Sequence, residues 1–160
     1  MPTTYEPITT TTLSSAQASV TFSSISGSYT DLVIVFSGSI TTGFDAINMQ
    51  FNSDTGTNYS RTVVAGNGSS ATSFRDSNMS AMQIGIMGTG QSNSTWNVMN
   101  YSNSTTFKTV ISRGNASANS VRANAGLWRS TSAITSVTLA AASSTFTTGS
   151  TFTIYGIKAA

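Results

Sequence analysis

The chain has 160 residues, a net charge of +2 and only 8% charged residues, and its length suits one domain with its own core. Cysteine and histidine are both absent, which excludes disulfides, thiolate sites and catalysis by a Ser–His or Cys–His pair. The seven Lys and Arg residues are scattered, and no apolar run approaches the ~20 residues of a membrane span, so we expect neither nucleic acid nor a membrane as a partner.

The start of the chain is rich in Thr and holds both prolines, at Pro2 and Pro7. Ser and Thr together make up about a third of the whole chain, and such a composition favours strands and turns over helices. We therefore expect an extended N-terminal arm at residues 1–12 and a single β-sandwich domain at residues 13–160. We also expect the chain to be an independent subunit rather than the end of a longer fibre shaft.

Two segments in the first quarter of the chain have the pattern of strands. Residues 18–24 alternate, with Val20 and Phe22 on one face, and a turn follows. Residues 31–38 hold five consecutive apolar residues, Leu32 to Phe36. A short continuous apolar run is typical of a strand that is covered on both faces. It predicts a central strand whose second face is covered by a loop or by a partner chain.

The middle of the chain alternates between short strands and turns. Residues 47–51 and 80–87 alternate as strands, whereas 52–57 has the Asn, Asp and Gly content of a turn. Residues 59–65 fit either a strand or a short helical turn. Residues 66–76 are rich in Gly, Asn and Ser and predict a long surface loop.

Period-two alternation returns in the last third of the chain, at residues 94–101, 106–113 and 121–128. Residues 137–141 and 152–156 alternate in the same way, and we expect them to form a closing β-hairpin or an adjacent strand pair. About nine or ten strands with turns every 8 to 12 residues predict an all-β fold, specifically an antiparallel, jelly-roll-like β-sandwich.

The acidic residues are too few to indicate a catalytic site. Asp45 and Asp54 could form a carboxylate pair, but both lie in turns, where Asp commonly caps the backbone. Residues 52–58 place oxygen-bearing side chains at alternate positions, yet they lack the acidic count of a calcium loop. We interpret both features as structural and predict no catalytic residue, no metal site, no cofactor and no enzyme activity.

The aromatic residues allow two interpretations. Trp96, Tyr101, Trp128 and Tyr155 could form a platform on which a sugar stacks, but aromatic residues of a β-sandwich more often lie in the core or at an interface. We favour the second interpretation. The residues that we expect at an interface with other subunits are Tyr5, Ile8, Val33, Val35, Trp96, Trp128 and Tyr155.

Several segments of the chain are similar to a known group of proteins. The stretches ASVTFSSISGSYTDLVIVFSG, QFNSDTGTNYS, WRSTSAITSVTL and FTTGSTFTIYGIK resemble small virion proteins of tailed bacteriophages, notably those of cyanobacteria and marine bacteria. The resemblance covers both ends of the chain and the fifties, but not residues 66–120. It implies a β-sandwich attached to a capsid or a tail, and hence a location in the virion after synthesis in the infected bacterial cytoplasm. It carries no catalytic residue.

Two functions from different classes follow. The first is a capsid decoration or cement protein, a homotrimer or other homo-oligomer in contact with the major capsid protein or with tail proteins. The small domain, the low charge and the apolar strand at 31–38 favour it, because few surface charges oppose association. The alternative is a tail-fibre or receptor-binding module that recognises a host glycan. An enzyme is the weakest hypothesis, because acids and bases are scarce.

Overall fold

The computed structural model describes residues 4–117 and 120–158. Within them every regular element is a strand and every ladder is antiparallel, which confirms the predicted fold class. The strands of the described residues number twelve rather than nine or ten, and the two additional ones are β1 and β6. In chain order they are β1 (Tyr5–Thr12), β2 (Ser19–Phe22), β3 (Asp31–Gly38), β4 (Phe44–Phe51), β5 (Tyr59–Gly66), β6 (Ala71–Met79), β7 (Met82–Gly88), β8 (Ser92–Met99), β9 (Lys108–Ala116), β10 (Ser120–Trp128), β11 (Val137–Ala141) and β12 (Thr151–Ile157).

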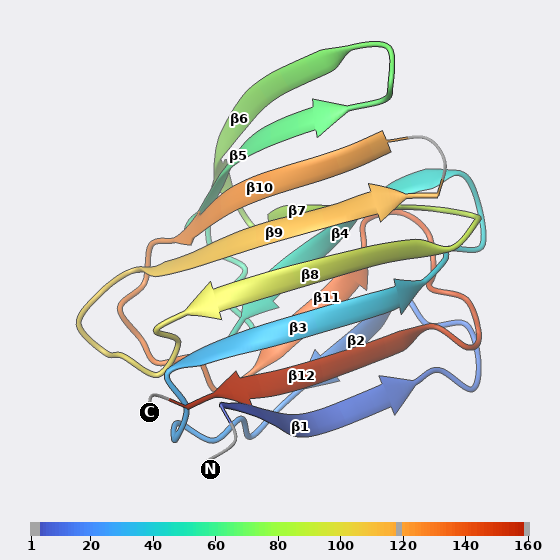
Figure 1. Cartoon of the computed structure of the whole chain (residues 1–160). Helices are drawn as coiled ribbons and strands as arrows, with labels where there is room; N and C mark the ends of the chain where they lie inside the picture. The colour runs from blue at the N-terminus through green and yellow to red at the C-terminus, as the bar shows by residue number, and fades with distance from the viewer. Residues whose placement is uncertain (1–3, 118–119, 159–160) are drawn as a thin grey trace.

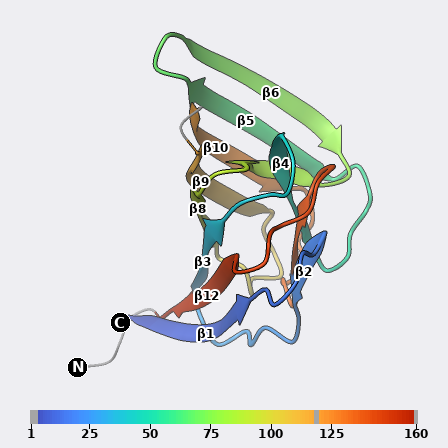
Figure 2. The same cartoon turned by 90° about the vertical axis from the view of Figure 1, so that its right-hand side faces the viewer.

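The strands form two sheets (Figure 1). The larger sheet has eight strands in the order β1-β12-β3-β8-β9-β10-β5-β6, and the smaller has four in the order β2-β11-β4-β7. In Figure 2 the eight-stranded sheet runs from β6 at the top, down the left side, to β1 at the bottom. The four-stranded sheet lies on its inner side. One face of the large sheet therefore covers the core, and the other is its outer face.

The core forms where alternate residues of both sheets meet. Ile34 and Phe36 of β3 and Trp96 of β8 are fully buried from one side, and Met49 and Phe51 of β4 from the other. The burial of alternate apolar side chains is the main stabilising term of such a sandwich, at about 25 cal/mol per Å² of apolar area. The predicted inward face of residues 47–51 is thereby confirmed.

The prediction that the chain closes with a hairpin is wrong. β11 pairs with β2 and β4 in the small sheet, whereas β12 pairs with β1 and β3 in the large one. The connecting segment crosses between the sheets and places Phe146 in the core, 4.9 Å from the ring of Phe152. Two isolated bridges, from Phe146 to Gln17 and to Ile40, hold this crossing. The two strands thus contribute to opposite layers.

The long surface loop expected at residues 66–76 is also not observed. β6 pairs with β5 over most of its length, and only residues 67–70 form the turn. The side-chain oxygen of Asn67 accepts hydrogen bonds from the backbone N–H groups of Ser69 and Ser70, at 3.0 and 2.8 Å. The polar composition of residues 66–76 predicted a loop, because β6 is exposed along most of its length and needs few apolar residues. The alternatives left open at 59–65 resolve as β5.

β3 is a central strand of the large sheet, as predicted, but only one of its faces is fully covered. Ile34 and Phe36 are inaccessible, while Val35 on the other face is 37% exposed. The neighbouring Val33 is 8% exposed. Within the described residues no loop covers this face, so the expectation of two covered faces does not hold at Val35.

The N-terminal segment forms the edge strand β1 and pairs with β12 from Tyr5 to Thr12, with an irregularity between Pro7 and Thr9. A proline at an irregular position of an edge strand is typical, because its nitrogen cannot donate to the ladder. Tyr5 and Ile157 lie opposite each other at one end of this pair. Most of the segment expected to be an arm therefore belongs to the large sheet, and residues 1–3 lie outside the described residues.

Polar residues and glycine face the core on β9 and β10. Lys108 is fully buried, and its ammonium donates to the backbone oxygens of Thr106 and Thr131 at 2.7 and 3.1 Å. Burial lowers the pKa of Lys108. Gly126 faces β7, where a Cβ atom would overlap the sulfur of Met82. The predicted alternation of both strands is present, but their more apolar faces point outward.

Candidate functional site

A bulge in β7 directs one backbone carbonyl away from its own sheet. Ile47 pairs with Gly85 and Asn48 with Gln83, so Ile84 has no partner in the ladder. A bulge leaves one residue unpaired and re-aims the chain beside it. Here the freed carbonyl of Ile84 is aimed at the large sheet.

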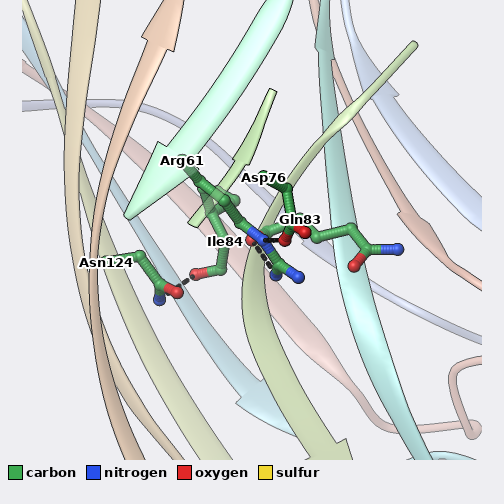
Figure 3. Close-up of polar contacts among 5 residues, drawn as sticks. All are labelled: Arg61, Asp76, Gln83, Ile84 and Asn124. Carbon is green, nitrogen blue, oxygen red and sulfur yellow. Dashed lines mark hydrogen bonds and ion pairs between the residues drawn. The ribbon is translucent and has the colours of Figure 1, made fainter. Parts of the chain in front are cut away.

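Three side chains of the large sheet donate hydrogen bonds to that carbonyl. They are Trp96 Nε1 at 2.9 Å, Ser112 Oγ at 2.7 Å and Asn124 Nδ2 at 3.2 Å. Figure 3 shows Asn124 approaching Ile84 from β10. Because a buried carbonyl without a donor is costly, this cluster ties the two sheets together at one point. All three donors of this cluster are used in hydrogen bonds to the Ile84 carbonyl, so we interpret the cluster as structural.

An ion pair lies beside this cluster, on the inner side of β5 and β6. Arg61 Nε lies 2.7 Å from Asp76 Oδ2, and one of its terminal nitrogens donates to the backbone oxygen of Gln83 at 2.7 Å (Figure 3). The side chain of Arg61 is 8% exposed and that of Asp76 is 40% exposed. The charge of Arg61 is thus compensated, and its contact with Gln83 joins the large sheet to β7.

Arg122 of β10 lies close to this ion pair but has different surroundings. Its guanidinium carbon lies 5.7 Å from the ring centre of Phe44 and 6.0 Å from that of Phe74. Arg61 approaches the same Phe74 ring at 5.3 Å. Arg122 also lines a cavity of about 290 Å³, which extends along the turn between β5 and β6.

The outer face of the eight-stranded sheet carries a row of exposed apolar side chains, which we call the outer apolar row. The residues of this row come from six strands and are 37–61% exposed: Tyr5, Val35, Val64, Met99, Ile111 and Val121. Figure 1 looks onto this face. A hollow of about 630 Å³ lies on it between Tyr5, Val33, Met99 and Ile111. Large apolar side chains grouped on one face are typical of an interaction surface.

The structure places the predicted interface residues in different surroundings. Tyr5 and Val35 belong to the outer apolar row, and Val33 and Tyr155 lie on the same face of the sheet with less exposure. Ile8 is partly buried and packs against the core.

Trp96 and Trp128 lie in the interior of the chain, at 0% and 2% exposure. Their contacts are therefore with this chain, and they do not belong to an exposed interface. Tyr101 is fully buried as well, so the sugar-stacking platform considered from the sequence does not form. Aromatic residues in strands fill the interior here because their large apolar area gains most from burial.

Asp45 and Asp54 both accept backbone hydrogen bonds, as the sequence indicates, but Asp45 lies in β4 and not in a turn. Asp45 accepts hydrogen bonds from the backbone N–H groups of Ser143 and Ser144, at 2.8 and 2.9 Å. Asp54 accepts from Trp128 Nε1 at 2.6 Å and from the backbone of Gly56 at 2.8 Å. Among residues 4–117 and 120–158, no three acidic side chains gather as metal ligands would.

The pKa of Asp54 is lowered in the folded chain. Burial acts to raise the pKa, but hydrogen bonds from Trp128, Asn58 and Gly56 to the carboxylate outweigh it. A folded-state pKa below the unfolded value means that the carboxylate stabilises the fold at neutral pH. This contribution is lost as the pH falls below the ordinary value of 3.8 and through the folded value.

We expect Asp54→Asn to lower the free energy of unfolding at pH 7 by about 1–2 kcal/mol, because charge-assisted hydrogen bonds are replaced by weaker neutral ones. Urea denaturation of both proteins from pH 7 to pH 2.5 would measure this, with the low end below the ordinary carboxyl pKa by about one unit. The difference between them should shrink as the pH falls. A difference of constant size across this range would contradict the assignment.

No protein-family model and no curated protein matches the sequence. An exo-inulinase from Aspergillus awamori has a similar structure at 13% identity and a TM-score of 0.46, over 96% of this chain and 29% of the inulinase. A mutant of the alginate lyase Aly36B, in complex with alginate tetrasaccharide, is similar at 7% identity and a TM-score of 0.34, over 94% and 80%.

The chain therefore spans less than a third of the inulinase chain. Neither similarity is close enough to bear on function. A separate finding concerns membranes: the described part of the chain contains no helix that is long and apolar enough to cross a bilayer.

Proposed function

We propose that the protein is a structural subunit of a bacteriophage virion that works through contacts with copies of itself and with capsid or tail proteins. The outer apolar row supports this proposal most directly. Six strands present large apolar side chains on one face, and burying them in an assembly would contribute about 25 cal/mol per Å².

The small number of charged residues also supports the proposal. The whole chain carries twelve charged residues, seven basic and five acidic. Asp31 and Arg113 are the charged residues beside the hollow in the outer face. Low charge leaves little repulsion between two copies that approach through this face. The resemblance of several segments to small virion proteins of tailed bacteriophages is the reason for proposing a capsid or a tail as the location of such an assembly.

We expect the wild-type protein to be an oligomer in solution and Ile111→Asp to dissociate it. A carboxylate placed at the centre of an apolar interface is buried without a partner, which costs about 3–5 kcal/mol and weakens association about a hundredfold or more. Light scattering coupled to gel filtration, over a range of protein concentrations, would measure the molar mass of both proteins.

Ser19→Asp provides a matched control, because Ser19 is exposed on β2 of the small sheet, away from the outer apolar row. This variant should keep the wild-type mass. A wild-type protein that is monomeric at every concentration would overturn the proposed self-association. Mass spectrometry of purified virions would test the location, and absence of the protein from the particles would overturn it.

The alternative function, a tail-fibre or receptor-binding module that recognises a host glycan, does not rest on the buried tryptophans. Its support is the cavity beside Arg122, which is lined by the half-exposed ring of Phe44 and by hydroxyl-bearing side chains. A protein present at the tip of the tail rather than over the shell would favour this alternative. Labelling of intact virions with an antibody would distinguish the two locations.

A further inference from the structure

Arg122 is a partly buried cation without a counter-charge among the described residues. Among the described residues its Nε is shielded from solvent and has no hydrogen-bond partner, and its guanidinium lies close to the aromatic rings of Phe44 and Phe74. Arg61, on the neighbouring strand, differs because Asp76 and the Gln83 carbonyl both accept from it. The pair of arginines with one carboxylate therefore has one positive charge in excess.

These surroundings disfavour the charged form of the Arg122 side chain. A guanidinium has five N–H donors, and aromatic rings supply no lone pairs in the plane where those donors point. Burial, and then the nearby charge of Arg61, lower the pKa of Arg122. An anion bound at the guanidinium would offset both effects.

The cavity next to Arg122 has the lining of a small-ligand site. The half-exposed ring of Phe44 forms an apolar side. Thr72 and Ser120 are hydroxyl-bearing residues of the cavity lining, and the hydroxyl of Ser120 is shielded from solvent and has no hydrogen-bond partner within the described part of the chain. Two unpartnered polar groups, Arg122 Nε and Ser120 Oγ, thus belong to residues that line the same cavity.

We propose that this cavity binds a sugar acid. Its carboxylate pairs with Arg122, a sugar hydroxyl bonds to Thr72, and its C–H face lies against Phe44. A single excess charge fits a carboxylate better than a doubly charged phosphate. The cavity volume of about 290 Å³ is at the lower end of the range for ligand sites and fits one small molecule. The site faces the inner side of β5, β6 and β10, so it is separate from the outer apolar row.

Titration of the whole protein with D-glucuronate, followed by two-dimensional NMR, tests the proposal. We expect saturable shifts of the backbone signals of Thr72 and Ser120. D-glucose and acetate each supply only part of the ligand chemistry, and both should bind about tenfold more weakly or worse. Arg122→Gln should weaken glucuronate binding by about tenfold or more.

Arg75→Gln is the matched control, because it removes the same charge from an exposed residue of β6 whose partner in the ladder is Thr62 rather than an inward-facing residue. It should leave glucuronate binding unchanged. Phe44→Leu is a second variant in case Arg122→Gln fails to fold, and it should weaken glucuronate but not acetate. Absence of saturable glucuronate binding, equal losses in Arg122→Gln and Arg75→Gln, or equal binding of inorganic phosphate would each overturn the proposal.

Discussion

Replacing Trp128 with alanine is expected to lower the free energy of unfolding by about 3–5 kcal/mol, the usual cost of removing a buried aromatic ring. The indole is 2% exposed and stacks on Tyr59, with ring centres 6.3 Å apart and an interplanar angle of 14°. The ring of Phe51 packs against it at 5.4 Å. Loss of the indole would therefore open a cavity between the end of β10 and the start of β5.

The Trp128 indole also holds the turn that follows β4. Its Nε1 donates to Asp54, and the hydroxyl of Tyr59 donates to the backbone oxygen of Asp54 at 3.1 Å. Both rings thus join one turn to the core. Burial raises the pKa of Tyr59 to about 12, because the phenolate is disfavoured where the hydroxyl is enclosed.

Trp128→Phe separates the two contributions of the indole. Phenylalanine keeps most of the apolar contact but cannot donate to Asp54, so its cost should be about 1–3 kcal/mol, smaller than that of alanine. Urea denaturation followed by far-UV circular dichroism would measure both variants. A Trp128→Ala protein that unfolds like the wild type, yet loses binding to cells or glycans, would show that this side chain serves recognition instead.

Strand positions could be predicted from the sequence wherever apolar residues alternated with polar ones. Val20 and Phe22 of β2, and Ile47, Met49 and Phe51 of β4, lie inward as their spacing predicts. β6 could not be recognised, because an edge strand that is exposed on both faces needs no apolar residues. Alternation of apolar and polar residues arises because one face of a strand is buried, so a strand without a buried face does not show it.

Sheet membership depends on contacts far apart in the chain and could not be predicted from local pattern. In the sequence, β11 and β12 look like the two strands of a hairpin. The segment between them instead crosses from one sheet to the other, with Phe146 buried in the core. Local alternation predicts that a strand exists and which residues share a face. It does not specify which neighbour the strand pairs with.

The candidate site could be predicted only in part. The backbone hydrogen bonds of Asp54 followed from its position in a turn, whereas Asp45 lies in β4 and bonds to residues that follow β11. The inward placement of Arg122 did not, although it shares a face with Asn124, Gly126 and Trp128 in the predicted alternation. A charged residue on the same strand face as a buried tryptophan was the available signal, because arginine rarely occupies an inward position without a partner or a ligand.

Replacing Trp96 with alanine is expected to lower the free energy of unfolding by about 3–5 kcal/mol, as for Trp128. Trp96 is fully buried, lies 6.3 Å from the ring of Phe36, and donates to the Ile84 carbonyl freed by the bulge in β7. Its loss would create a cavity and remove one of three donors that join the sheets. The variant should therefore lose more stability than Ser112→Ala, which removes one donor and little volume, at about 1 kcal/mol.

Thr95→Ala is the neighbouring control, because Thr95 faces the other side of β8 and is only partly buried. It should change stability by less than about 0.5 kcal/mol. Chemical denaturation of the three variants in one buffer would order them. If Trp96→Ala cost no more than Ser112→Ala, the indole would not be the main link between the layers, and the bulge at Ile84 would have to be held by Ser112 and Asn124 alone.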